Sequence, residues 1–198
     1  MDKPNVIYLH SHDTGRFIRP YGHAFDTPAM QRFAEQGVVF RQAFSAAPNC
    51  SPSRACLLTG EYPHNNGMHG LDHRGGFVLN DYGHHILHTL RDHGYLTVLG
   101  GLQHIGHDTD AIGFDRVLGN ARSPKAEVVV PRVVSFLSNA PEQPFFLDCG
   151  VHETHKNNRV FHSASIEPDA RFAPTPASLA DTPETRIEMS RFGEALSV

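Results

Sequence analysis

The sequence has few cysteines, no excess of basic residues and no long apolar run. Its three cysteines are a small and odd number, which excludes a scaffold held together by disulfides. Lysine and arginine number 17 against 21 aspartates and glutamates, and the net charge of −4 argues against nucleic acid as the main partner. No apolar stretch approaches the roughly 18 residues that a membrane span needs, and no secretory signal precedes the first apolar run. We therefore expect no membrane partner and a cytoplasmic location, unless a leader has been removed.

Histidine, in contrast, is abundant, with 15 residues and none beyond His162. Hydrophobic residues make up 39% of the 198 residues and charged residues 19%, which is typical of a globular domain with a substantial core. Some of the imidazoles are expected on a polar surface. Others are candidates for an anion or metal site.

Short apolar runs alternate along the chain with segments of helical periodicity. The expected strands are residues 5–9, 38–40, 95–99 and 145–151, and the expected helices are residues 28–36, 86–93, 125–139 and 183–196. This alternation predicts an α/β fold with a largely parallel sheet. In such sheets ligands bind beyond the carboxyl ends of the strands. Polar segments follow three of the strands, at residues 10–15, 101–107 and 152–155, and we expect them to line a site.

The segment CSPSRACLLTG, residues 50–60, carries the clearest chemical signal. Pro52 suits the first turn of a short helix, which would place Cys50 near the positive end of the helix dipole. Arg54 lies one turn further on, and a helix N-terminus with an arginine makes a pocket for a tetrahedral oxyanion. A buried, inert cysteine is the alternative interpretation. We expect it for Cys56 and Cys149, which have apolar neighbours.

The full segment resembles the signature of the type I sulfatases, in which the motif's cysteine is oxidised after translation to formylglycine. The following stretch HNNGMHG, residues 64–70, is similar to that of the heparan N-sulfatase (sulfamidase) branch. The resemblance implies an alkaline-phosphatase-like α/β fold, a mostly parallel sheet flanked by helices, of which this chain is a truncated, amino-terminal portion. Residues 1–162 would be the amino-terminal part of the catalytic domain. Residues 163–198 would be an extended, proline-rich segment and terminal helix of that domain.

The resemblance also implies an enzyme that hydrolyses sulfuric esters or sulfamates of a small molecule or saccharide. A formylglycine-generating enzyme would modify Cys50, and the hydrated aldehyde would serve as nucleophile. Arg54 would fix the hydrate. His104, in the segment GLQHIG, would act on the hydrate or the sulfate, and Gln103 would hydrogen-bond to the substrate. Leu102 stands where the family carries a lysine.

The same resemblance implies a Ca²⁺ ion or another divalent cation held by Asp13, His12 and the modified residue 50. His12 stands where the family has an aspartate, so it could ligate, hydrogen-bond to the site or shift the preference towards a softer ion. His155, in the segment VHETH, would hold the sulfate or protonate the leaving group. The segment 72–74 is expected at the substrate entrance.

Three alternatives remain open at this point. The first is a phosphonate or phosphate monoester hydrolase of the same superfamily, because the anions are similar in shape. The second is a catalytically incomplete, sulfatase-like fragment that binds an anion or metal without turnover. The third is a histidine-rich metal-binding module, although its histidines lack a compact zinc-type spacing.

Overall fold

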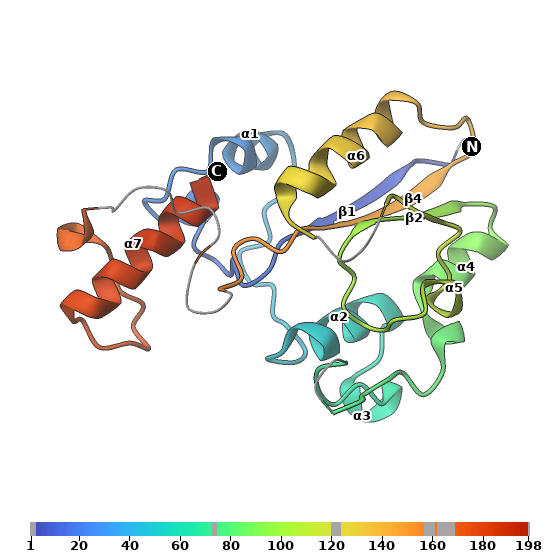
Figure 1. Ribbon diagram of the computed structural model, residues 1–198, viewed down its shortest axis with the longest axis horizontal. Helices are drawn as coiled ribbons and strands as arrows, with labels where there is room; N and C mark the ends of the chain where they lie inside the picture. Colours follow the sequence, from blue (N-terminus) through green and yellow to red (C-terminus); the bar gives the residue numbers. More distant parts are fainter. Residues whose placement is uncertain (1–2, 73–74, 120–123, 157–160, 162–168, 198) are drawn as a thin grey trace. The chain divides into compact units, whose positions relative to one another are not determined.

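The computed structural model describes residues 3–72, 75–119, 124–156, 161 and 169–197. The chain folds as two compact units, which we call the sheet unit (Met1–His10 and Phe44–His152) and the helical unit (Ser11–Ala43 and Glu153–Val198). Figure 1 labels strands β1, β2 and β4 in the sheet unit and helices α1 and α7 in the helical unit.

The sheet unit is built on a four-stranded parallel sheet in the order β1-β4-β2-β3. The strands are β1 (Val6–His10), β2 (Leu96–Gly101), β3 (Arg116–Val117) and β4 (Phe145–Gly150). Every residue of β4 is buried, which fits its position in the sheet interior and its mostly apolar sequence FFLDCG. At the carboxyl end His10 pairs with Gly150, and Gly150 pairs with Gly101. The segments that follow β1, β2 and β4 therefore leave from one end of the sheet, as predicted.

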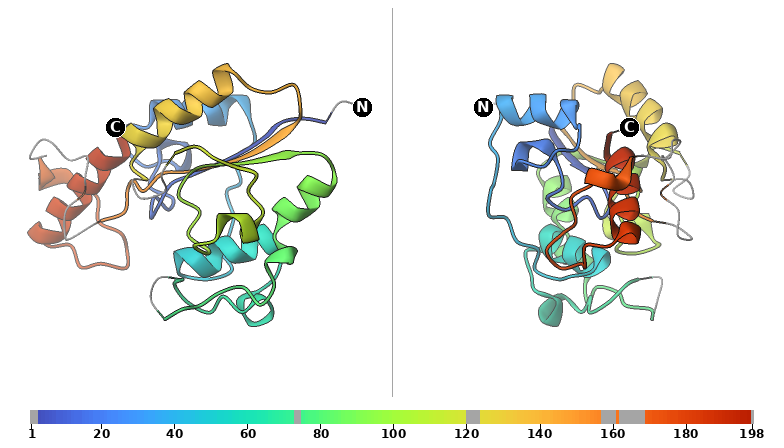
Figure 2. Two further views of the ribbon diagram at one scale, coloured as in Figure 1. Left: turned by 45° about the vertical axis from the view of Figure 1, so that its right-hand side comes forward. Right: turned by 90° about the vertical axis from the view of Figure 1, so that its left-hand side faces the viewer.

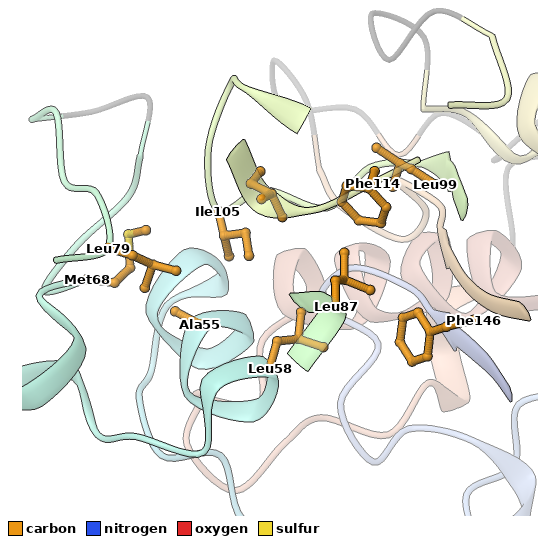
Figure 3. Close-up of a cluster of buried hydrophobic side chains, with 10 residues drawn as sticks. Ala55, Leu58, Met68, Leu79, Leu87, Leu99, Ile105, Phe114 and Phe146 are labelled. Carbon is orange, nitrogen blue, oxygen red and sulfur yellow. The ribbon is translucent and has the colours of Figure 1, made fainter. Parts of the chain in front are cut away.

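Helices cover both faces of this sheet (Figures 1 and 2). On one face α6 (Ala126–Ser138) packs Val133 into a cluster with Phe145 of β4. On the other face α2 (Cys50–Thr59) and α4 (Ile86–Asp92) pack Leu58 and Leu87 into a second cluster, which Phe146 joins (Figure 3). Phe145 and Phe146 enter opposite clusters because successive side chains of a strand point to opposite faces.

The remaining helices of the chain are short, apart from α1 and α7. They are η1 (Arg19–Tyr21), α1 (Pro28–Gln36), α3 (Pro63–Asn66), η2 (Tyr82–His84), α5 (Thr109–Ile112), η3 (Ala170–Phe172) and α7 (Pro183–Ser197). None of the helices in the described part of the chain combines the length and the apolar character that a membrane crossing requires.

Two glycines allow the strands to approach closely at the carboxyl end of the sheet. A Cβ at Gly150 would lie 1.9 Å from the carbonyl oxygen of Leu102 and 2.3 Å from the ring of His10. Gly101 has a φ of +103°, and a Cβ there would lie 2.1 Å from the carbonyl oxygen of Gly150. The absence of a Cβ at Gly150 leaves room for the His10 ring at the end of β4.

The helical unit has its own small core around α7. Phe192 of α7 meets Phe17, Phe25 and Phe161 edge to face, with ring centroids 5.6, 6.0 and 5.9 Å apart. Such aromatic pairs add to the free energy gained by burying their apolar surface. The loop after β1 and the tail of the chain are thereby packed together within one unit.

The structure confirms most of the predicted elements and corrects two points. Residues 38–40 form no strand, and Val38 and Phe40 are 80% and 70% exposed. A strand needs a neighbour to pair with, and no strand is assigned among the described residues of the helical unit. The sheet instead gains β3, a two-residue strand too short to give a periodic signal. Helix α1 forms as predicted, but none of its residues is buried.

Candidate active site

Cys50 is the first residue of α2, at the end where backbone N–H groups and the helix dipole favour negative charge. Asn49 precedes it as the N-cap residue, and the backbone carbonyl of Asn49 accepts the N–H of Ser53 at 3.0 Å. Cys50 is half-buried and forms no disulfide. Cys56 and Cys149 are buried in the core, as predicted, and burial raises the pKa of both thiols. Of the three, Cys50 therefore has the environment of a reactive cysteine.

Arg54 lies one helical turn beyond Cys50 and is buried, and its guanidinium contacts the ring of His10. Its Nη1 donates to Nδ1 of His10, and Nε2 of His10 donates to Oδ1 of Asp148 at 2.8 Å. Burial lowers the pKa of His10, the carboxylate of Asp148 opposes that shift, and the Arg54 guanidinium reinforces it. A neutral imidazole can accept from Arg54 and donate to Asp148 at once. His10, held in turn by Asp148, thus fixes the guanidinium of Arg54 in place.

His104 lies close to Cys50, because a ring nitrogen of His104 and the Sγ of Cys50 are within 4.8 Å of each other. Nε2 of His104 pairs with Oδ1 of Asp72 at 3.3 Å. Ser51 accepts the N–H of Asp72 at 3.3 Å and donates its hydroxyl to Oδ1 of the same residue at 3.4 Å. The first turn of α2 and the loop after β2 are thereby linked through one carboxylate.

The loop after β2 holds His104 in a left-handed backbone conformation, with a φ of +65°. The side chain of Gln103 braces this turn, since its Oε1 accepts the N–H of Ile105 at 2.6 Å and its Nε2 donates to the carbonyl of Gly106. The amide of Gln103 is thus bonded to its own loop. Its predicted contact with substrate stays a prediction.

In the helical unit, His12, Asp13 and His155 come together. Each offers one ligand atom, and these atoms lie within 4.8 Å of one another. Nδ1 of His155 pairs with Oδ2 of Asp13, and the rings of His12 and His155 meet edge to face at 5.6 Å. His12 donates its N–H to Glu153 at 2.9 Å and accepts the N–H of Thr154 at 2.8 Å, so backbone hydrogen bonds join the two loops.

Sequence reasoning placed Cys50 beside Arg54 and His104, and it missed the partners of those side chains. The signal for Asp148 was present, because an acidic residue inside the buried run FFLDCG needs a partner. Asp72 was expected at the substrate entrance. Its side chain contacts His104 and is only 6% exposed, and its place at the entrance stays a prediction. The neighbouring residues 73–74 lie outside the described residues. The roles assigned to Cys50 and His155 in binding metal and substrate stay predictions.

Comparison with known proteins gives consistent results. The sequence model of the sulfatase family matches residues 4–176. N-sulphoglucosamine sulphohydrolase of Homo sapiens is 31% identical over 161 residues, which are 77% of this chain and 32% of that protein. N-acetylgalactosamine-6-sulfatase of Canis lupus familiaris is 34% identical over 115 residues, which are 52% of this chain and 22% of that protein. The chain thus spans between about a fifth and a third of the length of these relatives.

Solved structures with the same fold are sulfatases as well. The structure of BT4656 in complex with its substrate D-glucosamine-2-N,6-O-disulfate aligns with a TM-score of 0.67 and 23% identity, over 89% of this chain and 40% of that chain. The structure of BT1596, a 2-O GAG sulfatase, aligns with a TM-score of 0.67 and 20% identity, over 99% of this chain and 52% of that chain. At these identities the likeness concerns the fold.

Proposed function

The chain belongs to the sulfatase family, and from this premise we propose that it provides the nucleophile and oxyanion-binding part of a hydrolase of saccharide sulfate esters or sulfamates. The observation that carries the proposal is the position of Cys50 at the start of α2, near His104 and one turn before the buried Arg54. The similarity to a sulphoglucosamine sulphohydrolase favours an N-sulfated glucosamine as substrate.

Formylglycine made from Cys50 would supply, as its hydrate, two hydroxyls on one carbon. One would attack the sulfur and displace the alcohol or amine of the substrate, and loss of the other's proton would re-form the aldehyde and expel sulfate. Neither an unmodified cysteine nor a serine has this second hydroxyl. The half-buried position of Cys50 at the helix start suits an anion there, because the backbone N–H groups of the first turn point towards it.

Arg54 provides positive charge next to this position. Its guanidinium is held by His10, which is itself held by Asp148, so the cation is oriented before any substrate arrives. A preorganised donor of this kind stabilises charge that develops in the transition state without reorganisation during the reaction.

His104 is the group best placed to move a proton at residue 50, because its ring nitrogen is within 4.8 Å of Sγ. Asp72 orients the imidazole through the 3.3 Å contact with Nε2. This arrangement of an acid, a histidine and a nucleophile is the general pattern by which proteins activate a weak nucleophile.

The divalent cation implied by the family fits the described residues only in part. Ca²⁺ takes six to eight oxygen ligands. The cluster in the helical unit offers one carboxylate, from Asp13, and two imidazoles, from His12 and His155. This donor set does not match Ca²⁺, so we assign no catalytic step to that ion.

The proposal is tested by expressing the chain with a formylglycine-generating enzyme and measuring the mass of the peptide that contains residue 50. We expect conversion of Cys50 to formylglycine and release of sulfate from an aryl sulfate or an N-sulfated glucosamine. Cys50→Ala abolishes turnover, whereas Cys56→Ala, six residues further on in α2, retains it. An unmodified thiol without turnover, or hydrolysis of phenylphosphonate in preference to sulfate, would contradict the proposal. The phosphonate alternative gains no support from the named relatives.

A further inference from the structure

We propose that His12, Asp13 and His155 form a binding site for a first-row transition-metal dication, of which Zn²⁺ and Co²⁺ are the probes, and that this site disfavours Ca²⁺. The inference deepens the proposed function, because it names the class of cation that the protein uses. Its test is metal binding, so its outcome does not depend on turnover.

The ligand atoms of the three side chains lie close together. They lie within 4.8 Å of one another, and side chains grouped in this way could hold one metal ion. Asp13 Oδ2 and His155 Nδ1 are already in contact, and the edge-to-face arrangement of the His12 and His155 rings brings the second imidazole to the same point. Two loops far apart in sequence supply the donors.

Hydrogen bonds hold the two loops together. The backbone carbonyl of His12 accepts both the N–H and the hydroxyl of Thr154, at 2.8 and 3.1 Å, and the N–H of His12 donates to the carbonyl of Glu153. Four polar contacts, counting the ion pair of Asp13 with His155, therefore connect residues 12–13 to residues 153–155. Ligands placed by backbone hydrogen bonds lose little entropy on binding an ion.

The chemistry of the donors favours a transition metal over Ca²⁺. Imidazole nitrogen suits Zn²⁺, Fe²⁺, Co²⁺, Ni²⁺ and Cu²⁺, whereas hard Ca²⁺ selects oxygen. Two histidines and one carboxylate recur in catalytic zinc and iron sites, where three protein ligands leave positions for water or substrate. The side chains of His155 and Asp13 are 39% and 57% exposed, so an ion can reach them from solvent. The position of His155 beside Asp13 favours a metal ligand over its predicted role in holding sulfate.

The experiment is metal titration of the chain after treatment with a chelator. We expect one equivalent of Zn²⁺ to bind by calorimetry, one equivalent of Co²⁺ to give visible d–d absorption, and Ca²⁺ to compete with neither. His12→Ala and His155→Ala each weaken Zn²⁺ binding by more than about 100-fold, beyond what the loss of an outer-shell partner costs. His107→Ala, an exposed histidine of the sheet unit, leaves the affinity unchanged.

A second variant reverses the selectivity. His12→Asp replaces an imidazole with a carboxylate, so the ratio of the Ca²⁺ to the Zn²⁺ dissociation constant falls by at least about tenfold.

The proposal is overturned by tight Ca²⁺ binding to the unaltered chain, by an unchanged Zn²⁺ affinity in His12→Ala, or by an equal loss of Zn²⁺ affinity in His107→Ala. If a variant does not fold, the affinities of the unaltered chain for Zn²⁺ and Ca²⁺ still test the proposal. Selective Ca²⁺ binding accompanied by sulfate release would defeat this inference alone, whereas Zn²⁺ binding without any sulfate release would defeat the proposed function alone.

Discussion

Arg54 is a buried cation, and its expected role in binding an oxyanion depends on the shape of the guanidinium as well as on its charge. Its guanidinium reaches the His10 ring, which in turn contacts the buried carboxylate of Asp148. A lysine keeps the charge but cannot reproduce the planar fork of donors. The guanidinium is therefore expected to act as a positioned oxyanion donor, and this is testable by a conservative substitution.

We expect Arg54→Lys to lower kcat/KM for sulfate hydrolysis by about 10²–10³-fold, the usual cost of losing one oxyanion-stabilising donor. The measurement is steady-state kinetics on an aryl sulfate, with the urea midpoint recorded to show that the fold survives. Arg91→Lys is the control, because Arg91 is in the same unit but pairs with Asp115 at 3.0 Å on the surface. Unaltered kinetics in Arg54→Lys would show that the arginine has a structural role only.

The sequence identifies the individual reactive residues but not the side chains that hydrogen-bond to them. Cys50, Arg54 and His104 are recognisable because they lie in compact motifs. His10 and Asp148 are 138 residues apart, and only the pairing of β1 with β4 brings them together. Contacts of this kind depend on strand register, which a local pattern does not specify.

At the scale of elements, the start of α4 depends on a buried histidine. Nδ1 of His85 accepts the N–H of Leu87 at 3.2 Å, so His85 serves as the N-cap of α4. The residue is 1% exposed, and burial lowers its pKa from 6.5 to about 4, with the nearby His88 contributing. Because the folded protein binds this proton less readily than the unfolded chain, stability is full above pH 6.5 and falls as the pH drops towards 4.

We predict that the free energy of unfolding falls by about 2 kcal/mol between pH 7.5 and pH 5 on account of His85. His85→Asn keeps a side-chain acceptor at the N-cap and removes the titration, so this component of the pH dependence disappears. Urea unfolding of both proteins at the two pH values measures the difference. Equal pH dependence in both proteins would mean that His85 does not carry the effect.

Gly150 lies at the carboxyl end of the sheet, where there is no room for a side chain. Gly150→Ala is expected to lower the free energy of unfolding by about 1–3 kcal/mol, because the new Cβ overlaps the backbone oxygen of Leu102 and the His10 ring. Gly37→Ala is the control, since its φ of −133° is ordinary and its Cβ would lie 3.4 Å from its nearest neighbour. Denaturant midpoints measure both. Equal effects would show that the close approach at Gly150 is not the cause.

The elements that sequence predicted correctly are those with a long periodic signal. Helix α6 and strand β4 each match the predicted range closely, because their apolar residues fill a face or a whole strand. The run at 38–40 has the same residue types, but three β-branched and aromatic residues form a strand only where a partner is available. Strand β3 shows the reverse case, since pairing with Val98 and Leu99 makes a strand out of two residues without a pattern of their own.

At the scale of the whole chain, many apolar side chains are exposed, and β1 is the clearest case. Ile7 and Leu9 are 50% and 71% exposed. In the described part of the chain β1 pairs only with β4, so its other edge presents backbone groups ready to pair. An apolar, unpaired edge strand is a template for association with another chain.

We therefore predict that the chain, studied alone, associates with itself through the edge of β1, and that Leu9→Lys increases the fraction of monomer. A lysine on an edge strand opposes pairing, because a second chain would have to bury its charge. Light scattering after gel filtration at several concentrations measures the effect. Phe33→Lys is the matched control, because Phe33 is 80% exposed but lies on helix α1, which has no strand edge to offer. An equal increase in both variants would indicate general apolar association, and no increase in Leu9→Lys would exclude the β1 edge as the contact.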